Sequence, residues 1–275
     1  MSLYAVFGDP IAQSRSPWIH ARFAEQTSVS LRYEARRASL DEFELALADF
    51  RSDGGRGANV TAPLKELAAT LCSELSPMAH RAGAVNTLIA SEAGWIGDNT
   101  DGRGLLADLD RQGMWVASAR VLMLGAGGAA RGALPALLQR QPAELVLANR
   151  DPARAQHVAG HLITLGEIRP WAWADLSKAG SFDLVVHATS AGLHGHALAL
   201  PDGLLARDGA AYDLSYGRAA SAFLQWATAA GAEVCSDGLG MLVEQAAESF
   251  ALWHGVRPQT DAVLAELREQ VGGWA

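Results

Sequence analysis

A glycine-rich turn between a strand-like and a helix-like segment constrains the fold of this chain more than any other feature. Residues 121–124 are apolar, as in a buried strand, and Gly125-Ala126-Gly127-Gly128-Ala129-Ala130 follows directly, leading into an alanine-rich helical pattern. In a strand–turn–helix context, the spacing G-x-G-x-x-(G/A) indicates a dinucleotide-binding unit. Gly125 permits the tight turn, Gly127 lets the backbone approach a pyrophosphate, and Ala130 lets the helix pack close. The free N–H groups at the start of the helix would face the phosphates.

The turn lies in the middle of a chain of 275 residues, so more than a hundred residues precede it. That length is sufficient for two domains, and 49% hydrophobic and 19% charged residues are typical of a globular protein. A formal net charge of −8 argues against general nucleic-acid binding, which requires a basic surface. This net charge does not exclude a local basic pocket that binds a single phosphate.

The cysteines, Cys72 and Cys235, are far apart and belong to no metal-binding pattern, so we expect no disulfide, no metal site and a cytoplasmic location. The first eight residues resemble a strand rather than a signal peptide. No apolar run approaches the roughly 18 residues that suggest a membrane span.

The first hundred residues alternate between strand and helix patterns. Ser16-Pro17 predicts a helix start, with Ser16 as the N-cap and Pro17 at the first helical position. Such βαβ alternation predicts a mostly parallel sheet covered by helices. The strands expected here span residues 3–8, 31–37, 57–61 and 84–90, and the further helices span residues 40–50 and the segment from Pro63 onward.

A helix over residues 101–112 is expected to lead into a Rossmann-type doubly wound domain. Its predicted strands span residues 121–124, 145–148, 168–171, 184–187 and 211–214, with helices starting near Gly128, Pro152 and Ala219. Two final helices, over residues 242–253 and 259–271, would return to the first domain. We therefore expect a substrate-binding and catalytic domain from 1–102 plus 239–275, and a nucleotide-binding domain from 103–238.

The residues after the second strand of this nucleotide-binding unit favour NADP over NAD. An acid at that position would hold the ribose 2′-hydroxyl of NAD, but the strand ends in Asn149-Arg150, with Arg154 one turn later. Arg150 and Arg154 could clamp a 2′-phosphate, although solvated surface arginines are the simpler alternative. Asp151, followed by Pro152, is suited to capping the next helix, but its carboxylate would weaken NADP binding somewhat.

Polar residues in the first domain gather at turns beside strand ends, where ligands of open α/β sheets collect. Hydroxyls, amides, a lysine and an aspartate suit a small polyhydroxylated acid. Taken singly, Ser16, Asn59 and Asp101 could be caps, and Lys65 could be a surface lysine. Asn86 within a strand is harder to explain structurally, because a buried amide needs partners.

Together these segments closely resemble the shikimate dehydrogenase family, in family order and over nearly the whole chain. The matching segments are Ser14-Arg15-Ser16-Pro17, Asn59-Val60-Thr61-x-Pro63-x-Lys65, Gly83-Ala84-Val85-Asn86-Thr87, Gly97-Asp98-Asn99-Thr100-Asp101-Gly102, Gly125-Ala126-Gly127-Gly128-Ala129, Asn149-Arg150 and Asp237-Gly238-Leu239-Gly240-Met241-Leu242.

The resemblance implies NADPH-dependent reduction of 3-dehydroshikimate to shikimate, on the route to chorismate and aromatic amino acids. Lys65 would transfer the proton, with Asp101 as its partner. Substrate contacts are implied for Ser14, Ser16, Asn59, Thr61, Lys65, Asn86, Asp101, Tyr216 and Gln245. Cofactor contacts are implied for Gly125, Ala126, Gly127, Gly128, Ala129, Asn149, Arg150, Arg154, Thr189, Leu214 and Gly238.

The chemistry agrees with that implication, because hydride transfer to a ketone leaves negative charge on oxygen. A lysine ammonium stabilises that charge and then supplies a proton. The chain departs from the family pattern at Asp151, where a threonine is usual, and at His187, where an asparagine is usual. It also departs at Ala62 and Leu64, which replace larger apolar residues, and after Tyr216.

Two other functions stay open at the level of the sequence. One is a dehydrogenase that accepts quinate or a similar ring acid, with NAD in place of NADP. The other is a catalytically silent nucleotide-binding regulator, against which the presence of both Lys65 and Asp101 argues. The expected partner is the small-molecule substrate, with no nucleic acid and no membrane, and the chain could be a monomer or a homodimer.

Overall fold

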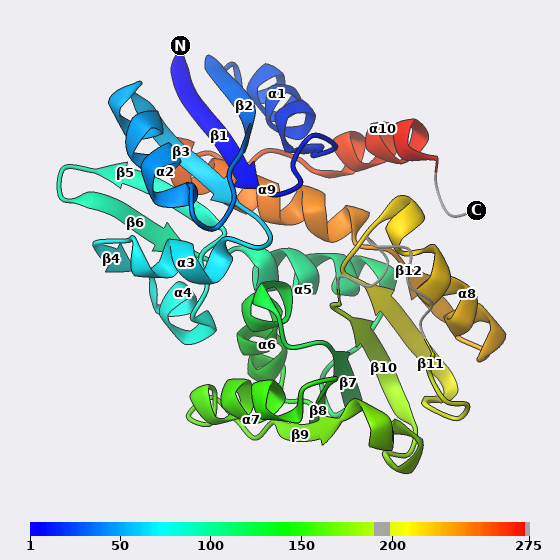
Figure 1. Ribbon diagram of the computed structural model, residues 1–275. Coiled ribbons are helices and arrows are strands. Elements are labelled where there is room, and N and C mark those ends of the chain that lie inside the picture. Colours follow the sequence, from blue (N-terminus) through cyan, green and yellow to red (C-terminus); the bar gives the residue numbers. More distant parts are fainter. Residues whose placement is uncertain (190–198, 273–275) are drawn as a thin grey trace.

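Two six-stranded sheets organise the protein, and the chain completes the first before it builds the second (Figure 1). The computed structural model describes residues 1–189 and 199–272. This architecture confirms the predicted α/β fold with two domains. None of the helices in the described ranges is both long and apolar enough to cross a membrane.

The first sheet has the strand order β2-β1-β3-β5-β6-β4. Its strands are β1 (Ser2–Gly8), β2 (Leu31–Arg37), β3 (Gly55–Val60), β4 (Glu74–Leu75), β5 (Thr87–Ser91) and β6 (Gly94–Asp98). β1 is parallel to β2 and β3, and β4 is parallel to β6, whereas β5 is antiparallel to both of its neighbours. The sheet is thus mostly parallel, as predicted, but the β5–β6 hairpin is a finding of the structure.

The expected strand over residues 84–90 is only partly correct, because β5 begins at Thr87. The residues before it form a connection that reaches two other segments. The backbone N–H of Val85 donates to the carbonyl of Lys65, and that of Asn86 donates to the carbonyl of Asp98. This connection therefore joins the start of α3 to the end of β6.

Four helices accompany the first sheet. They are α1 (Ser16–Thr27), α2 (Phe43–Ser52), α3 (Lys65–Thr70) and α4 (Pro77–Ala82). Phe7 of β1, Phe50 of α2 and Leu64 are fully buried in one apolar cluster, which fixes the turn before α3 against the sheet. The predicted N-cap of α1 is wrong: Arg15 is the N-cap residue, and Ser16 is the first helical residue.

The second sheet is entirely parallel, with the order β12-β11-β10-β7-β8-β9. Its strands are β7 (Arg120–Leu124), β8 (Glu144–Asn149), β9 (Arg169–Ala172), β10 (Phe182–His187), β11 (Leu205–Asp213) and β12 (Val234–Ser236). The strand order reverses between β7 and β10, which makes the carboxyl end of β7 the switch point where such sheets bind ligands. All five predicted strands are present, and β12 is an addition.

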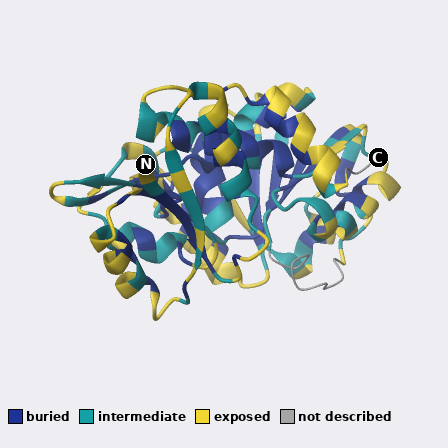
Figure 2. Cartoon of the chain, turned by 90° about the horizontal axis from the view of Figure 1, so that it is seen from above, coloured by how far each residue is buried: buried dark blue, intermediate teal, exposed yellow. Residues whose placement is uncertain are grey.

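In the described part of the chain, three α-helices and two short 3-10 helices connect these strands. The α-helices are α6 (Gly128–Gln139), α7 (Pro152–His161) and α8 (Ser221–Ala229), and the 3-10 helices span Trp173–Lys178 and Gly217–Ala219. Helices α6 and α7 begin where the sequence predicts, whereas α8 begins two residues later than expected. Figure 2 shows buried segments running through both sheets and exposed residues on the surrounding helices and loops.

Helix α5 (Asp101–Gln112) links the two sheets, and α9 (Leu239–His254) and α10 (Asp261–Val271) lead back to the first one (Figure 1). Ile19 and Phe23 of α1 share an apolar cluster with Phe250 of α9 and Leu267 of α10. The return of the terminal helices is therefore confirmed. Helix α9 starts at Leu239, three residues earlier than predicted.

Candidate active site

Lys65 and Asp101 form an ion pair at the centre of the candidate site. The Lys65 Nζ lies 2.5 Å from Asp101 Oδ2, and the side chains are only 12% and 6% exposed. Each residue is the first of its helix, Lys65 of α3 and Asp101 of α5. A carboxylate in the first turn of α5 is favoured by the helix dipole. The structure thus brings together the two residues predicted to carry the proton transfer.

Asn86 holds the second oxygen of Asp101. Its Nδ2 donates to Asp101 Oδ1 over 2.8 Å and to Thr100 Oγ1 over 2.9 Å. Its Oδ1 accepts from the backbone N–H of Thr100 over 2.9 Å and from Thr87 Oγ1 over 2.8 Å. Asn86 is 2% exposed, so the amide that seemed out of place in the sequence is a fully bonded buried group.

Helix α9 closes this network from the other side. Gln245 Oε1 accepts from Asn86 Nδ2 over 3.3 Å, and Ser249 Oγ lies 2.8 Å from Thr87 Oγ1. Gln245 was predicted from the family resemblance, but Ser249 was not predicted. Ser249 follows Gln245 by one helical turn, and nothing in its local sequence distinguishes it from any other helical serine.

Asn59 joins the network to two further side chains, Tyr33 and Ser249. Its Nδ2 donates to the Asn86 carbonyl and to Ser249 Oγ, over 3.1 and 2.9 Å. Its Oδ1 accepts from the hydroxyl of Tyr33 over 2.7 Å. Asn59 is 6% exposed, and both polar atoms of its amide already have protein partners. Tyr33 is a further residue that the sequence did not single out.

The remaining predicted substrate residues occupy three other segments. Ser14 and Ser16 lie before and at the start of α1, and the backbone N–H of Ser16 donates to Ser14 Oγ over 3.3 Å. Thr61 follows β3 and precedes Lys65, and its N–H donates to the carbonyl of Phe7. Tyr216 follows β11 of the second sheet and packs against the apolar cluster of α1, α9 and α10. Burial raises the pKa of the Tyr216 hydroxyl.

The glycine turn lies beside Lys65. Gly125 has a φ of +106°, and a Cβ there would lie 3.0 Å from the Ala188 carbonyl, so both conformation and space require glycine. Gly127 is the N-cap of α6 and faces open space. A Cβ on Gly128 would lie 3.3 Å from Lys65 Cβ, so the turn is in close contact with the lysine stem.

The polar residues at and after the end of β8 differ in the number of hydrogen bonds and ion pairs that they form with other protein groups. Asp151 Oδ1 accepts from Ala153 N over 3.0 Å, which confirms that Asp151 caps α7. Asn149 Nδ2 donates to the carbonyl of Asp151 over 3.0 Å. Arg150 is exposed and has no hydrogen-bond or ion-pair partner within residues 1–189 and 199–272. Arg154, by contrast, donates to the Ala126 carbonyl and pairs with Glu66 of α3, both over 3.0 Å.

Thr189, Leu214 and Gly238 follow the ends of β10, β11 and β12, on the other side of the switch point. His187 Nδ1 lies 2.9 Å from Asp213 Oδ2, and its Nε2 lies 2.6 Å from Thr189 Oγ1. Leu214 N donates to the His187 carbonyl, and a Cβ on Gly238 would clash with the Leu214 carbonyl oxygen. His187, which replaces the usual asparagine, therefore ties Thr189 to the end of β11. Residues 190–198, which follow Thr189, lie outside the described residues.

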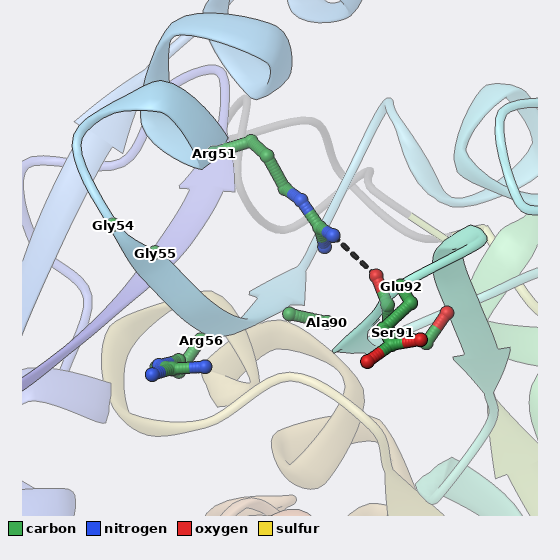
Figure 3. A pocket seen from close by; sticks show the side chains of 7 residues that line it. All are labelled: Arg51, Gly54, Gly55, Arg56, Ala90, Ser91 and Glu92. Carbon is green, nitrogen blue, oxygen red and sulfur yellow. Dashed lines mark hydrogen bonds between the residues drawn. The ribbon is translucent and has the colours of Figure 1, made fainter.

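Figure 3 shows the residues that line a hollow between the end of α2, the start of β3 and the end of β5. It lies at the start of β3, whereas Lys65 follows the end of β3. Arg51, which lines it, already donates to the carbonyl of Ser91 and lies over the ring of Trp95. The part of the chain that the structure describes contains no group of three or more His, Cys, Asp or Glu side chains that could hold a metal ion.

Three family models match this chain. They are the shikimate dehydrogenase substrate binding domain over residues 6–88, shikimate / quinate 5-dehydrogenase over residues 109–194, and the shikimate 5'-dehydrogenase C-terminal domain over residues 238–268.

Two curated relatives and one solved structure carry the likeness over nearly the whole chain. The shikimate dehydrogenase (NADP(+)) of Xanthomonas campestris pv. campestris strain 8004 is 54% identical, covering 98% of this chain and 96% of its own length. That of Dechloromonas aromatica is 51% identical and covers 98% of each chain. The shikimate 5-dehydrogenase of Thermus thermophilus, in complex with NADP(H) and shikimate, has a TM-score of 0.83 at 34% identity, covering 98% of this chain and 99% of its own. The chain therefore belongs to the shikimate dehydrogenase family.

Proposed function

We propose that this protein is an NADP-dependent shikimate dehydrogenase, which interconverts 3-dehydroshikimate and shikimate. The observation that carries the proposal is the buried Lys65–Asp101 pair beside the glycine turn. The proposal rests on the close contact of the Lys65 stem with Gly128, because a proton donor at that position would be near a nucleotide bound at the turn. The curated relatives of this chain are named for the same activity.

Lys65 is assigned the proton transfer. During reduction, hydride addition at the ketone carbon breaks the carbonyl π bond, and the Lys65 ammonium donates a proton to the resulting alkoxide. When bound, NADPH supplies the hydride and leaves as NADP⁺. Asp101 orients the ammonium through one oxygen, while Asn86 fixes its other oxygen. In the oxidation of shikimate, a neutral Lys65 accepts the hydroxyl proton.

The substrate would lie on the open side of this network. We assign its carboxylate to Ser14 and Ser16, and its ring hydroxyls to Thr61, Asn86, Asp101 and Gln245, with Tyr216 against the ring. Asn59 keeps the substrate contact that the resemblance implied. Protein groups occupy both its polar atoms, as they do those of Asn86, so either amide would share an atom between the substrate and a protein partner. Removal of Asn59 should also disturb Asn86 and Ser249, to which its amide donates.

The nucleotide site fits NADP on observations of this structure. Gly127 leaves the start of α6 open, as a pyrophosphate requires, and Arg150 is exposed and unpaired within the described residues. We assign the pyrophosphate to residues 125–129 and the 2′-phosphate to Asn149, Arg150 and Arg154. Thr189, Leu214 and Gly238 would line the nicotinamide end.

We propose the domain division 1–102 plus 239–275 and 103–238. Its support is that the strands of the first sheet end at Asp98, while those of the second run from Arg120 to Ser236. A cytoplasmic location is consistent with Cys72 and Cys235 being free thiols. Whether the protein is a monomer or a homodimer would be measured by light scattering.

A matrix of two substrates and two cofactors tests the function. Initial rates of nicotinamide reduction by purified protein would be measured at 340 nm with shikimate or quinate and with NADP or NAD. The expected result is the highest kcat/KM for shikimate with NADP. A higher value for quinate with NAD would favour the broader dehydrogenase, and no reduction with any pair would favour a silent nucleotide-binding regulator. A parallel Lys65→Ala preparation controls for a contaminating dehydrogenase.

A further inference from the structure

Glu66, the residue after Lys65, reaches from the first domain to the second. Its Oε1 lies 3.0 Å from Arg154 Nη2, and its Oε2 lies 3.7 Å from Arg131 Nε. Arg131 belongs to α6 and Arg154 to α7, the two helices that frame the proposed nucleotide site. One carboxylate therefore connects the helix of the proposed catalytic lysine to both of them. We call these three side chains the interdomain clasp.

The two arginines of the clasp differ in their surroundings. The Arg131 side chain is 9% exposed, and its Nε has no hydrogen-bond partner in the described part of the chain. A buried guanidinium N–H without a hydrogen-bond acceptor is costly, so a nearby anion is favoured. Within residues 1–189 and 199–272, Glu66 is the one carboxylate within ion-pair distance of Arg131. The clasp is therefore an anion-binding position that the chain fills with its own carboxylate.

Arg154 carries the proposed link to the cofactor. Its Nε is fixed to the carbonyl of Ala126 in the glycine turn, so its Nη2 is left to face Glu66. Arg150, four residues earlier, has no such partner within the described residues. The two arginines assigned to the 2′-phosphate therefore start from different states, one free and one already paired with a carboxylate.

A phosphate monoester and a carboxylate repel each other and use the same N–H donors of a guanidinium. Glu66 is 44% exposed, so its carboxylate can leave Arg154 without being stranded away from water. Arg131 offers a second cation to which it can move. A ligand without a 2′-phosphate does not compete with Glu66 for Arg154, so the Glu66–Arg154 ion pair stays formed.

We propose that Glu66 is a specificity-determining residue that competes with the cofactor 2′-phosphate for Arg154. The inference rests on the proposed NADP site. Binding of a 2′-phosphate breaks the Glu66–Arg154 pair, whereas a nucleotide with a 2′-hydroxyl leaves the clasp intact. Because Glu66 adjoins Lys65, arrival of NADP also loosens one contact of the helix that begins with the catalytic lysine.

Nucleotide fragments isolate this effect from catalysis. Calorimetric titration would compare 2′,5′-ADP, which carries the 2′-phosphate, with 5′-AMP, which lacks it. Glu66→Gln keeps the size of the side chain and removes its charge. It should tighten binding of 2′,5′-ADP by about two- to fivefold, the range expected for a partly exposed ion pair, and leave 5′-AMP binding unchanged. Glu25→Gln, which removes an exposed carboxylate paired with Arg22 on α1, is the matched control and should change neither affinity.

A cycle with Arg154→Gln shows whether Glu66 acts through Arg154. In that background the Glu66→Gln effect on 2′,5′-ADP should disappear. Equal tightening of both nucleotides, no tightening of either, or an effect that persists without Arg154 would each overturn the proposal. If the wild-type protein did not bind 2′,5′-ADP more tightly than 5′-AMP, both the proposed NADP site and the role of Glu66 would be refuted. If the binding results were as expected but the protein did not oxidise shikimate, only the proposed function would be refuted and the role of Glu66 would stand.

Discussion

The replacement of Asn86 by alanine is the sharpest test of how the site is held together. Asn86 lies in the connection between α4 and β5, and its amide reaches Asp101 on α5 and Gln245 on α9. It is 2% exposed, so water does not already share these bonds. The amide therefore connects three segments that are distant in sequence.

The cost follows from the partners that would be left without a bond. Thr87 and Thr100 have hydroxyls that can turn to Ser249. Within the described residues, the backbone N–H of Thr100 and the Oδ1 of Asp101 have Asn86 as their partner and no other. An unsatisfied buried group costs about 1–3 kcal/mol, so the free energy of unfolding should fall by about 2–6 kcal/mol. At about 2–4 °C per kcal/mol, the Tm should fall by about 10 °C.

Thermal unfolding followed by far-UV circular dichroism, without ligand, would measure the change. Asn149→Ala is the matched control, because it removes the same atoms from a side chain whose bond to the Asp151 carbonyl is solvent-exposed. That variant should lose less than about 1 kcal/mol. A loss for Asn86→Ala no larger than that of the control would refute the reasoning that the buried amide satisfies groups that nothing else can reach.

Three further predictions concern chemistry, cofactor choice and pH. Lys65→Ala should lower kcat by about 10²–10⁴-fold in steady-state assays with little change in the KM for shikimate, and near-wild-type turnover would exclude the proton-transfer role. Arg150→Ala should raise the KM for NADP and leave that for NAD nearly unchanged, whereas equal losses would show that Arg150 does not contact the 2′-phosphate. Burial lowers the pKa of His20 to about 3 from 6.5, so the unfolded chain binds this proton more readily and stability falls as the pH drops below about 6.5. Urea unfolding at pH 7 and pH 5 should show a smaller loss for His20→Phe than for the wild type, and equal losses would contradict this account.

The fold was predictable wherever a local signal had one physical meaning. The Gly125 turn, the Asp151 cap and the apolar strands of the second sheet appear where the sequence places them. The β5–β6 hairpin was missed because strands in parallel and antiparallel pairs carry similar apolar patterns. Its direction depends on a short turn that ends at Gly94, whose φ is +132°. Ser16 was misjudged because Pro17 is tolerated at the second helical position as well as the first.

The site was less predictable, because its contacts join residues far apart in the sequence. Lys65 and Asp101 were identified through the family resemblance, and composition or spacing alone would have left both as ordinary helix residues. Asn59 and Ser249 bond across 190 positions. Glu66 and Arg154 pair across 88 positions. A serine or a glutamate on a helix surface carries no sign of such a distant partner, so these roles required coordinates.

The placement of Lys65 explains why the chain tolerates a buried ion pair, which is a poor source of stability in itself. Asp101 accepts a hydrogen bond from Lys65 with one oxygen and from Asn86 with the other, so both oxygens of the carboxylate are fixed. The ammonium has three N–H donors and uses one of them on Asp101, which leaves two for a substrate oxygen. The lysine stem meanwhile contacts Gly128 at the nucleotide turn. A neutral side chain packed as well at position 65 would stabilise the fold at least equally, but it could not carry out the proton transfer that we propose for Lys65.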